Sequence, residues 1–329
     1  MKLKGAPVLV TGAGGFIGSH LCEALLDRGA QVTALVRYTS RNHPGNLRFL
    51  PPASFQAIEV VYGNIEDSDL VLNLARGKSC IFHLAALIGI PYSYQAPRST
   101  FQANLNGTLN ILEAARKHGV EKVVQTSSSE VYGTARYTPM DESHPLQAQS
   151  PYAASKIAAD KLAESYHLAF QTPVATIRPF NTYGPRQSAR AVIPTLLSQA
   201  LAGGTVRTGS LEPVRDLTEV SDTAKGFIRI AECDAAIGQV INIGTGHGIS
   251  IGGLMKLIFD KLGIDPHIEI DPQRIRPENS EVMELVCDNR KAVGTLGWKP
   301  SVSLEEGIDR TIEWMRGNLD LFRIGTYEV

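Results

Sequence analysis

The chain has 329 residues, of which 43% are hydrophobic and 20% are charged, and its formal net charge is -1. These values exclude an extensively disordered chain and argue against a basic surface for nucleic acid or an anionic membrane. No apolar run approaches the roughly 20 residues of a membrane span, and glycines come too early for a signal peptide. We therefore expect a cytoplasmic protein without nucleic-acid or membrane partners.

The cysteines are scattered along the chain, without the spacing of a zinc site or of a disulfide framework. They are Cys22, Cys80, Cys233 and Cys287. We expect them to be small buried side chains, and we predict no metal site.

Short β-branched runs alternate with longer amphipathic segments through the first half of the chain, which is typical of βαβ units on a parallel sheet. Strands are predicted over residues 7–12, 31–37, 58–64, 80–86, 122–128 and 173–180. Helices are predicted near 16–29, 67–77, 99–118 and 151–171. The predicted fold class is α/β, with a Rossmann-like, doubly wound parallel sheet.

The alternation weakens after residue 180, where Pro179, Gly184, Pro185 and Pro194 interrupt the pattern. One more helix and strand, in TEVSDTAKGFIRIAE and QVINIG, predict that the chain returns to the sheet over about 217–247. We therefore assign residues 1–180 to an NAD(P)-binding domain. Residues 181–216 and 248–329, with a last helix near 303–317, are assigned to a smaller C-terminal substrate-binding lobe.

The first motif is VTGAGGFIG, in which a strand leads into glycines and then into a helix that starts with Phe16 and Ile17. Gly12 allows the tight turn, Gly15 lets the backbone approach a pyrophosphate, and Gly18 permits close packing. The free N–H groups of the helix N-terminus favour an anion. An ordinary glycine-rich turn is the alternative, but the place of the motif after the first strand favours dinucleotide binding.

The end of the second strand bears on the choice between NAD and NADP. An acidic residue there would bind the ribose 2′-hydroxyl of NAD, but the sequence has Val36 and Arg37. Arg37 could neutralise a 2′-phosphate, with Arg41 sharing or replacing this role, which slightly favours NADP. A solvated surface arginine is the alternative.

Tyr152 and Lys156 in SPYAASKIAAD stand four residues apart and hence on one face of a helix. A phenol is a poor base near neutrality, but an adjacent amine and a nearby nicotinium would stabilise the phenolate. The pair could then remove a proton from a sugar hydroxyl while hydride leaves the same carbon. This spacing also occurs by chance on exposed helices.

Taken together, these motifs resemble the extended short-chain dehydrogenases/reductases, the family of nucleotide-sugar epimerases, dehydratases and decarboxylases. The resemblance runs nearly end to end, through TGAGGFIGSH, FHLAA, NLNGTLNILEAAR, SSSEVYG, YAASK, RPFNTYGPRQ, RDLTEVSD and RPENSEV. It implies that Ser128 assists Tyr152 and that the cofactor stays tightly bound. It also implies a homodimer that pairs the helices near 99–118 and 151–171 in a four-helix interface.

The resemblance also implies binding residues for the cofactor and the substrate. Those for the cofactor are Asn64, Ile65, Leu84, Ala85, Ala86 and Pro179. Those for the nucleotide sugar are Asn181, Arg190, Arg215 and Arg276. Asn64 stands where many relatives carry Asp, a departure that concerns cofactor choice.

Glu130 follows Ser128 and Ser129 directly after a predicted strand. Oxidation of a hexose at C4 makes the C5 proton acidic, so a carboxylate beside C5 could remove it while a hydroxyl leaves C6. The resemblance makes Glu130 this base. Ser129 stands where dTDP-glucose dehydratases carry Asp and resembles the GDP-mannose dehydratases, which implies that Glu130 performs both proton transfers. A salt bridge or a helix cap is the structural alternative for Glu130.

Three alternative functions remain. A C4 epimerase needs no acid or base beyond Tyr152, and Glu130 counts against it. A UDP-glucuronate decarboxylase is the stronger alternative, since such enzymes also show TSEVYG. A catalytically silent NADP-sensing regulator on the same fold would be expected to lack Tyr152 or Lys156. The wider resemblance is to UDP-N-acetylglucosamine 4,6-dehydratases of legionaminic-acid-type pathways, which implies a 4-keto-6-deoxy sugar nucleotide as product.

Overall fold

A central parallel sheet organises the protein, whose computed structural model describes residues 1–327. Its strand order is β10-β6-β5-β4-β1-β2-β3, and every neighbouring pair is parallel. The strands are β1 (Pro7–Thr11), β2 (Gln31–Arg37), β3 (Glu59–Gly63), β4 (Cys80–His83), β5 (Lys122–Thr126), β6 (Val174–Pro179) and β10 (Val240–Ile243). The predicted α/β class and the parallel sheet are confirmed.

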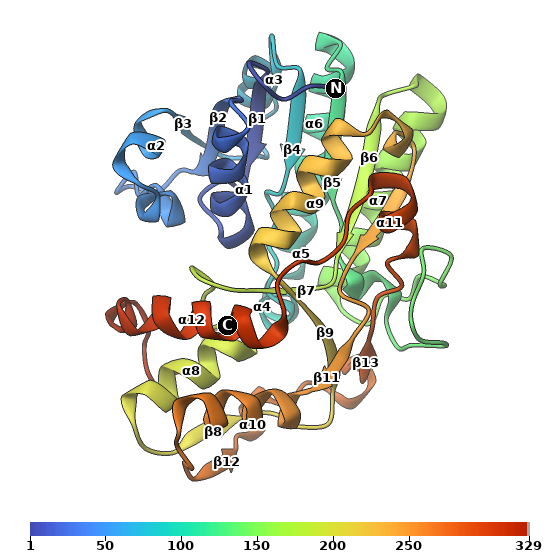
Figure 1. Ribbon diagram of the computed structural model, residues 1–329. Coiled ribbons are helices and arrows are strands. Elements are labelled where there is room, and N and C mark those ends of the chain that lie inside the picture. Colours follow the sequence, from blue (N-terminus) through green and yellow to red (C-terminus); the bar gives the residue numbers. More distant parts are fainter. Residues whose placement is uncertain (328–329) are drawn as a thin grey trace.

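Helices cover both faces of this sheet (Figure 1). Helices α1 (Phe16–Asp27) and α9 (Val220–Glu232) contact each other on one face, while α3 (Ser68–Ala75), α6 (Gly107–His118) and α7 (Pro151–Phe170) cover the other. Successive residues of a strand point to opposite faces, so Val8 and Val10 belong to one hydrophobic cluster and Leu9 to another. This is why the strands read as continuous apolar runs.

The sheet reverses its winding direction between β1 and β4, which are neighbours although β2 and β3 lie between them in the sequence. In open α/β sheets, ligands bind at the carboxyl ends of the strands at such a switch point. Gly12 follows β1 and Leu84 follows β4 at this edge. The strand order therefore positions the glycine motif and the segment after β4 beside each other.

The remaining strands form smaller sheets at the other end of the molecule (Figure 1). One contains β7 (Asn181–Tyr183), β9 (Val214–Glu219), β11 (Gly248–Ser250) and β13 (Glu284–Leu285), and the other pairs β8 (Val206–Thr208) with β12 (Ile268–Ile270). Helices α8 (Val192–Ala202), α10 (Ile251–Leu262) and α12 (Leu304–Arg316) contribute to a separate hydrophobic core. The exact division into a cofactor domain and a substrate lobe stays a prediction.

The helix predicted near 99–118 is interrupted. It consists of α5 (Pro97–Phe101), a π-helical segment (Gln102–Asn106) and α6. Within the segment, the side chain of Asn104 is only 2% exposed. A β-carbon at Gly107 would lie 2.9 Å from Ile65, so this glycine allows α6 to approach the end of β3 closely. The sequence pattern did not predict the interruption.

Other elements were also not predicted from the sequence. They include α8 and the short helices α2 (Pro52–Gln56), α4 (Ile90–Gln95) and α11 (Arg290–Leu296). The four cysteines are all free; three are buried as expected and Cys233 is half-buried. Among residues 1–327, no helix is both long and apolar enough to span a membrane, and no cluster of potential metal ligands is found.

Candidate active site

The glycine motif forms a tight turn between β1 and α1. Gly12 has a φ of +70°, and a β-carbon there would lie 2.8 Å from the backbone nitrogen of Ala85. At Gly18 a β-carbon would lie 2.3 Å from the carbonyl oxygen of Gly12. Gly15 is the N-cap of α1 and makes no side-chain capping bond, so the N–H groups of Phe16 and Ile17 belong to an uncapped helix N-terminus. This cradle fits a pyrophosphate.

Polar contacts fix the segment that follows β4. Thr11 Oγ1 lies 2.8 Å from His83 Nδ1 and accepts a hydrogen bond from the backbone nitrogen of Ala85 at 3.2 Å. The backbone nitrogen of Leu87 donates to Asn104 Oδ1 at 2.7 Å. The predicted cofactor positions Leu84, Ala85 and Ala86 therefore lie directly beside the glycine turn.

Two predicted cofactor residues, Asn64 and Ile65, lie directly after β3. Ile65 is 8% exposed, and its carbonyl oxygen accepts from Asn110 Nδ2 at 3.0 Å. Asn64 uses its side-chain oxygen to accept from the backbone nitrogen of Glu66. Arg37 is the exposed last residue of β2. Two strand ends of the same sheet, β2 and β3, thus present these residues together.

Tyr152 and Lys156 lie in the first turns of α7, which begins with Pro151 after the N-cap Ser150. Both are buried, with exposed fractions of 7% and 4%. Lys156 Nζ donates to the carbonyl oxygen of Thr126 at 2.9 Å. Because Thr126 is the last residue of β5, this bond ties the amine to the end of a central strand.

Burial shifts the pKa of both groups toward their neutral forms. It raises the pKa of Tyr152 to about 12, an effect that the side-chain hydrogen bond with Ser128 opposes and the charges of Glu130 and Asp160 reinforce. It lowers the pKa of Lys156 to about 8, against the effect of Asp160. The hydrogen bond with Ser128 and the influence of the Glu130 charge indicate that the predicted catalytic residues gather around the phenol.

Glu130 lies in a 3-10 turn over Ser129–Tyr132, which directly follows Ser128. The backbone nitrogen of Glu130 donates to Ser128 Oγ at 3.2 Å, so the serine oxygen is an acceptor here and its hydroxyl proton is available to Tyr152. The Glu130 carboxylate is 13% exposed and lies 3.9 Å from Arg276 Nη1. Ser129 is buried.

The predicted substrate residues do not all lie together. Arg215, on β9, donates from Nη2 to Glu281 Oε1 at 3.1 Å. Asn181 begins β7, and its Oδ1 is buried without a hydrogen-bond partner among the described residues. Arg190 is exposed and contacts Ser188 at 3.4 Å. Pro179, which was predicted to contact the cofactor and not the substrate, is buried at the end of β6.

Two residues of this region, Asn104 and Glu281, were not predicted from the sequence. Asn104 Nδ2 donates to the carbonyl oxygen of Leu87 at 3.1 Å and to Ser155 Oγ at 2.9 Å, so it joins the segment after β4 to the helix of Tyr152. The sequence signal that could have identified Asn104 is a polar residue on the inward-packing face of a predicted helix. Glu281 lies beside Arg215 and Arg276, a contact that no local pattern predicts.

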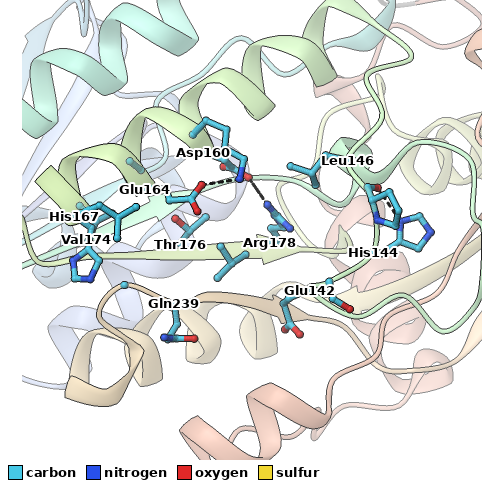
Figure 2. Close-up of a pocket in the computed structure, with 17 residues that line it drawn as sticks. Glu142, His144, Leu146, Asp160, Glu164, His167, Val174, Thr176, Arg178 and Gln239 are labelled. Carbon is cyan, nitrogen blue, oxygen red and sulfur yellow. Dashed lines mark hydrogen bonds and ion pairs between the residues drawn. The ribbon is translucent and has the colours of Figure 1, made fainter.

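A cavity of about 430 Å³ lies elsewhere, between α7, β6 and the edge strand β10 (Figure 2). Figure 2 shows Asp160 and Arg178 joined across it by an ion pair, with Oδ2 and Nη2 2.9 Å apart. None of the predicted site residues, all of which the structure describes, lines this cavity. Because it lies apart from the predicted site and its two cations pair with Asp160 and Glu164, we do not assign it to the reaction.

The model of the GDP-mannose 4,6 dehydratase family matches residues 9–311. The chain belongs to this family. The UDP-glucose 4-epimerase of Mycolicibacterium smegmatis is 38% identical over 94% of the chain and 98% of that protein. The dTDP-glucose 4,6-dehydratase of Streptomyces antibioticus is 34% identical over 94% of the chain and 92% of that protein. Relatives of this member of the GDP-mannose 4,6 dehydratase family thus include both epimerases and dehydratases.

The chain is also similar to the solved structure of a dehydratase. DesIV, the dTDP-glucose 4,6-dehydratase of Streptomyces venezuelae, was determined with NAD bound; it has a TM-score of 0.86 and 30% identity, covering 96% of the chain and 99% of DesIV. This GDP-mannose 4,6 dehydratase family member is therefore an enzyme of the NAD-dependent nucleotide-sugar dehydratase and epimerase group. The glycine cradle fits such a dinucleotide, and the membership leaves open which of the group's reactions it performs.

Proposed function

We propose that the protein is a nucleotide-sugar 4,6-dehydratase. The observation that supports this most strongly is the place of Glu130: a largely buried carboxylate in the turn after Ser128, close enough to Tyr152 to affect its pKa. A 4,6-elimination needs an acid-base group in addition to the phenol. A simple C4 epimerisation does not.

NADP or NAD would be held at the carboxyl ends of β1 and β4, with the pyrophosphate on Gly15 and the N-terminus of α1. When bound, the nicotinamide supplies the acceptor for the C4 hydride and later the donor of that hydride to C6. Arg37, at the exposed end of β2, is our proposed contact for a 2′-phosphate. An internally recycled hydride favours a tightly bound cofactor.

The chain's own residues would move the protons. Tyr152 takes the proton of the C4 hydroxyl, and Lys156 stabilises the phenolate that accepts it. Glu130 then removes the proton from C5 and gives it to the C6 hydroxyl, which leaves as water. When hydride arrives at C6, C5 takes up a proton from solvent, so the overall conversion is redox-neutral.

For the substrate, we propose UDP-N-acetylglucosamine or a similar nucleoside-diphosphate hexose. The support is the sequence resemblance along SSSEVYGTARYTPMDESHPLQAQSPYAASK, RPFNTYGPRQSARAVIP and RPENSEVMEL. A second support is the pair of arginines in this region, with Arg276 beside Glu130 and Arg215 beside Glu281. Arg215, Arg276 and Asn181 would bind the diphosphate side of the substrate. The product would be a 4-keto-6-deoxy sugar nucleotide.

The experiment that tests this function is incubation with a panel of UDP-, GDP- and dTDP-hexoses and UDP-glucuronate, followed by mass spectrometry. A dehydratase releases one water and retains the nucleotide. Loss of carbon dioxide from UDP-glucuronate would instead establish the decarboxylase. The epimerase remains a candidate because of the Mycolicibacterium smegmatis relative, and it would give an isomer of unchanged mass.

We also propose that the enzyme is a homodimer. The supporting observation is that α6 and α7 present large apolar side chains to the surface: Leu109 is 37% exposed, Leu168 is 74% exposed and Phe170 is 51% exposed. These helices contact each other, so a second copy could cover both at once in a four-helix arrangement.

A further inference from the structure

Glu281 places one carboxylate oxygen between two arginines. Its Oε1 lies 3.1 Å from Arg215 Nη2 and 3.7 Å from Arg276 Nη1. The three side chains are shielded from solvent, with exposed fractions of 18% for Glu281, 8% for Arg215 and 27% for Arg276. The charge of this carboxylate therefore acts on both guanidinium groups at once, with less screening than at an open surface.

Arg276 is held between two carboxylates. Its Nη1 lies 3.7 Å from Glu281 Oε1 and 3.9 Å from Glu130 Oε1. Both distances are too long for a hydrogen bond, and Nη1 is a buried atom without a hydrogen-bond partner among the described residues. Among the described residues, only these two longer-range charge interactions hold Nη1, so its N–H groups remain available to a closer acceptor.

The four groups form a cluster whose formal charges cancel. Arg215 and Arg276 supply two cations, and Glu130 and Glu281 supply two anions. Burial lowers the pKa of Arg215, and both carboxylates counteract this shift while Arg276 adds to it. The carboxylates thus stabilise the arginines where solvent cannot, and an added polyanion would compete with them for the same donors.

We propose that, without substrate, Glu281 occupies the arginine groups that would bind the substrate's diphosphate, and that substrate binding transfers Arg276 from the carboxylates to the diphosphate. This inference rests on the proposed function, in which Arg215 and Arg276 bind that diphosphate. It adds a consequence for the chemistry. Departure of Arg276 removes the cation that lies 3.9 Å from Glu130, so the catalytic carboxylate is released from this ion pair only when a diphosphate is present.

The test measures how a nucleoside diphosphate binds to the holoenzyme and to Glu281→Gln by titration calorimetry. The probe is whichever of UDP, GDP and dTDP binds the wild type most tightly. Without the competing charge, Glu281→Gln should bind it about three- to tenfold more tightly. The matched control Glu284→Gln, which removes the same charge on β13 outside the cluster, should leave the affinity unchanged.

A second probe separates this role from contact with the ribose. The corresponding nucleoside, which has no phosphate, should bind wild type and Glu281→Gln equally. Unchanged or weaker diphosphate binding by Glu281→Gln would overturn the proposal, as would weaker binding of the nucleoside. Glu281→Asp keeps the negative charge on a side chain that is one methylene shorter, which moves the charge away from the arginines. Its gain in diphosphate affinity should be smaller than that of Glu281→Gln. If neither variant folds, as judged by circular dichroism, the carboxylate is structurally required and the proposal fails.

The outcomes also distinguish this inference from the proposed function. If the wild type binds none of the nucleoside diphosphates and dehydrates no sugar nucleotide, the proposed function fails. If the wild type dehydrates a sugar nucleotide but Glu281→Gln gains no affinity, only the role of Glu281 fails.

Discussion

Burial at the start of α7 shifts the pKa of both Tyr152 and Lys156. Burial raises the pKa of the phenol to about 12 and lowers the pKa of the amine to about 8. The amine therefore keeps its charge at neutral pH and can stabilise a phenolate, whereas the phenol needs that help to act as a base. The hydrogen bond to the carbonyl oxygen of Thr126 holds the Lys156 amine in position to stabilise the phenolate.

Replacing Tyr152 with Phe removes the proton acceptor and keeps the ring. We expect the rate of C4 oxidation to fall by about 10²- to 10⁴-fold, while cofactor affinity changes little because the glycine cradle is untouched. Single-turnover formation of reduced nicotinamide, followed by absorbance, measures the rate, and calorimetry measures the affinity. Turnover like that of the wild type would show that another group is the base.

Arg37 decides between the two nicotinamide cofactors in our account. A charge-assisted hydrogen bond to a 2′-phosphate contributes about 1.5–3 kcal/mol, so protein stripped of nucleotide should bind NADP about tenfold or more tightly than NAD. Arg37→Ala should remove most of this preference, and Arg41→Ala tests whether the neighbouring arginine shares the role. Equal affinities in the wild type would make Arg37 a plain surface residue.

At the scale of an element, the start of α1 depends on the missing side chain of Gly18. A β-carbon there would lie 2.3 Å from the carbonyl oxygen of Gly12 and 2.9 Å from the α-carbon of Ala13. Both are backbone atoms, so the turn itself must move. Because overpacking costs about 1–3 kcal/mol, Gly18→Ala should weaken NAD(P) binding about tenfold or more.

Gly294→Ala is the matched control for this prediction. Gly294 lies within α11, and nothing is found within 4 Å of its ideal β-carbon. Here the substitution should stabilise the fold by about 0.5–1 kcal/mol, as alanine does in helices, and cofactor affinity should not change. Thermal unfolding and calorimetry on both variants provide the comparison. A similar loss of affinity in the two variants would show that the effect at Gly18 is not steric.

At the scale of the whole molecule, the exposed apolar residues of α6 and α7 predict self-association. We expect a dimer by light scattering at micromolar concentration. Leu168→Glu places a charge on a side chain that is 74% exposed, so it should shift the protein toward the monomer without lowering its melting temperature by more than a few degrees. A wild type that is strictly monomeric would contradict the four-helix arrangement.

Most of the central sheet could be predicted from the sequence because its strands are short, largely apolar runs rich in β-branched residues and separated by helical patterns. The clustering of Ser128, Glu130 and Tyr152 was also predictable, since two of them follow a strand end and the third begins the next helix. The contacts of Asn104 and Glu281 were not. They depend on tertiary packing: Arg215 and Glu281 stand 66 positions apart, and no periodicity encodes such a pair.

The short strands beyond residue 180 were missed for a different reason. Strands β7, β8, β11 and β12 have three residues each, which is too short for an alternating pattern to stand out from a loop. The π-helical segment before α6 spans only five residues, so the apolar spacing of the flanking helices did not predict it.

Glu130→Gln tests the dehydratase proposal most directly. The variant keeps the size of the side chain but lacks the basic oxygen, so C4 oxidation should proceed while elimination fails. Mixed with the true substrate, it should accumulate reduced nicotinamide and a 4-keto sugar that retains its C6 hydroxyl. In deuterated water the wild type should place deuterium at C5 of the product, and the variant should not. Normal 6-deoxy product from Glu130→Gln at a rate near that of the wild type would contradict the account, because another group would then have to be the C5 base.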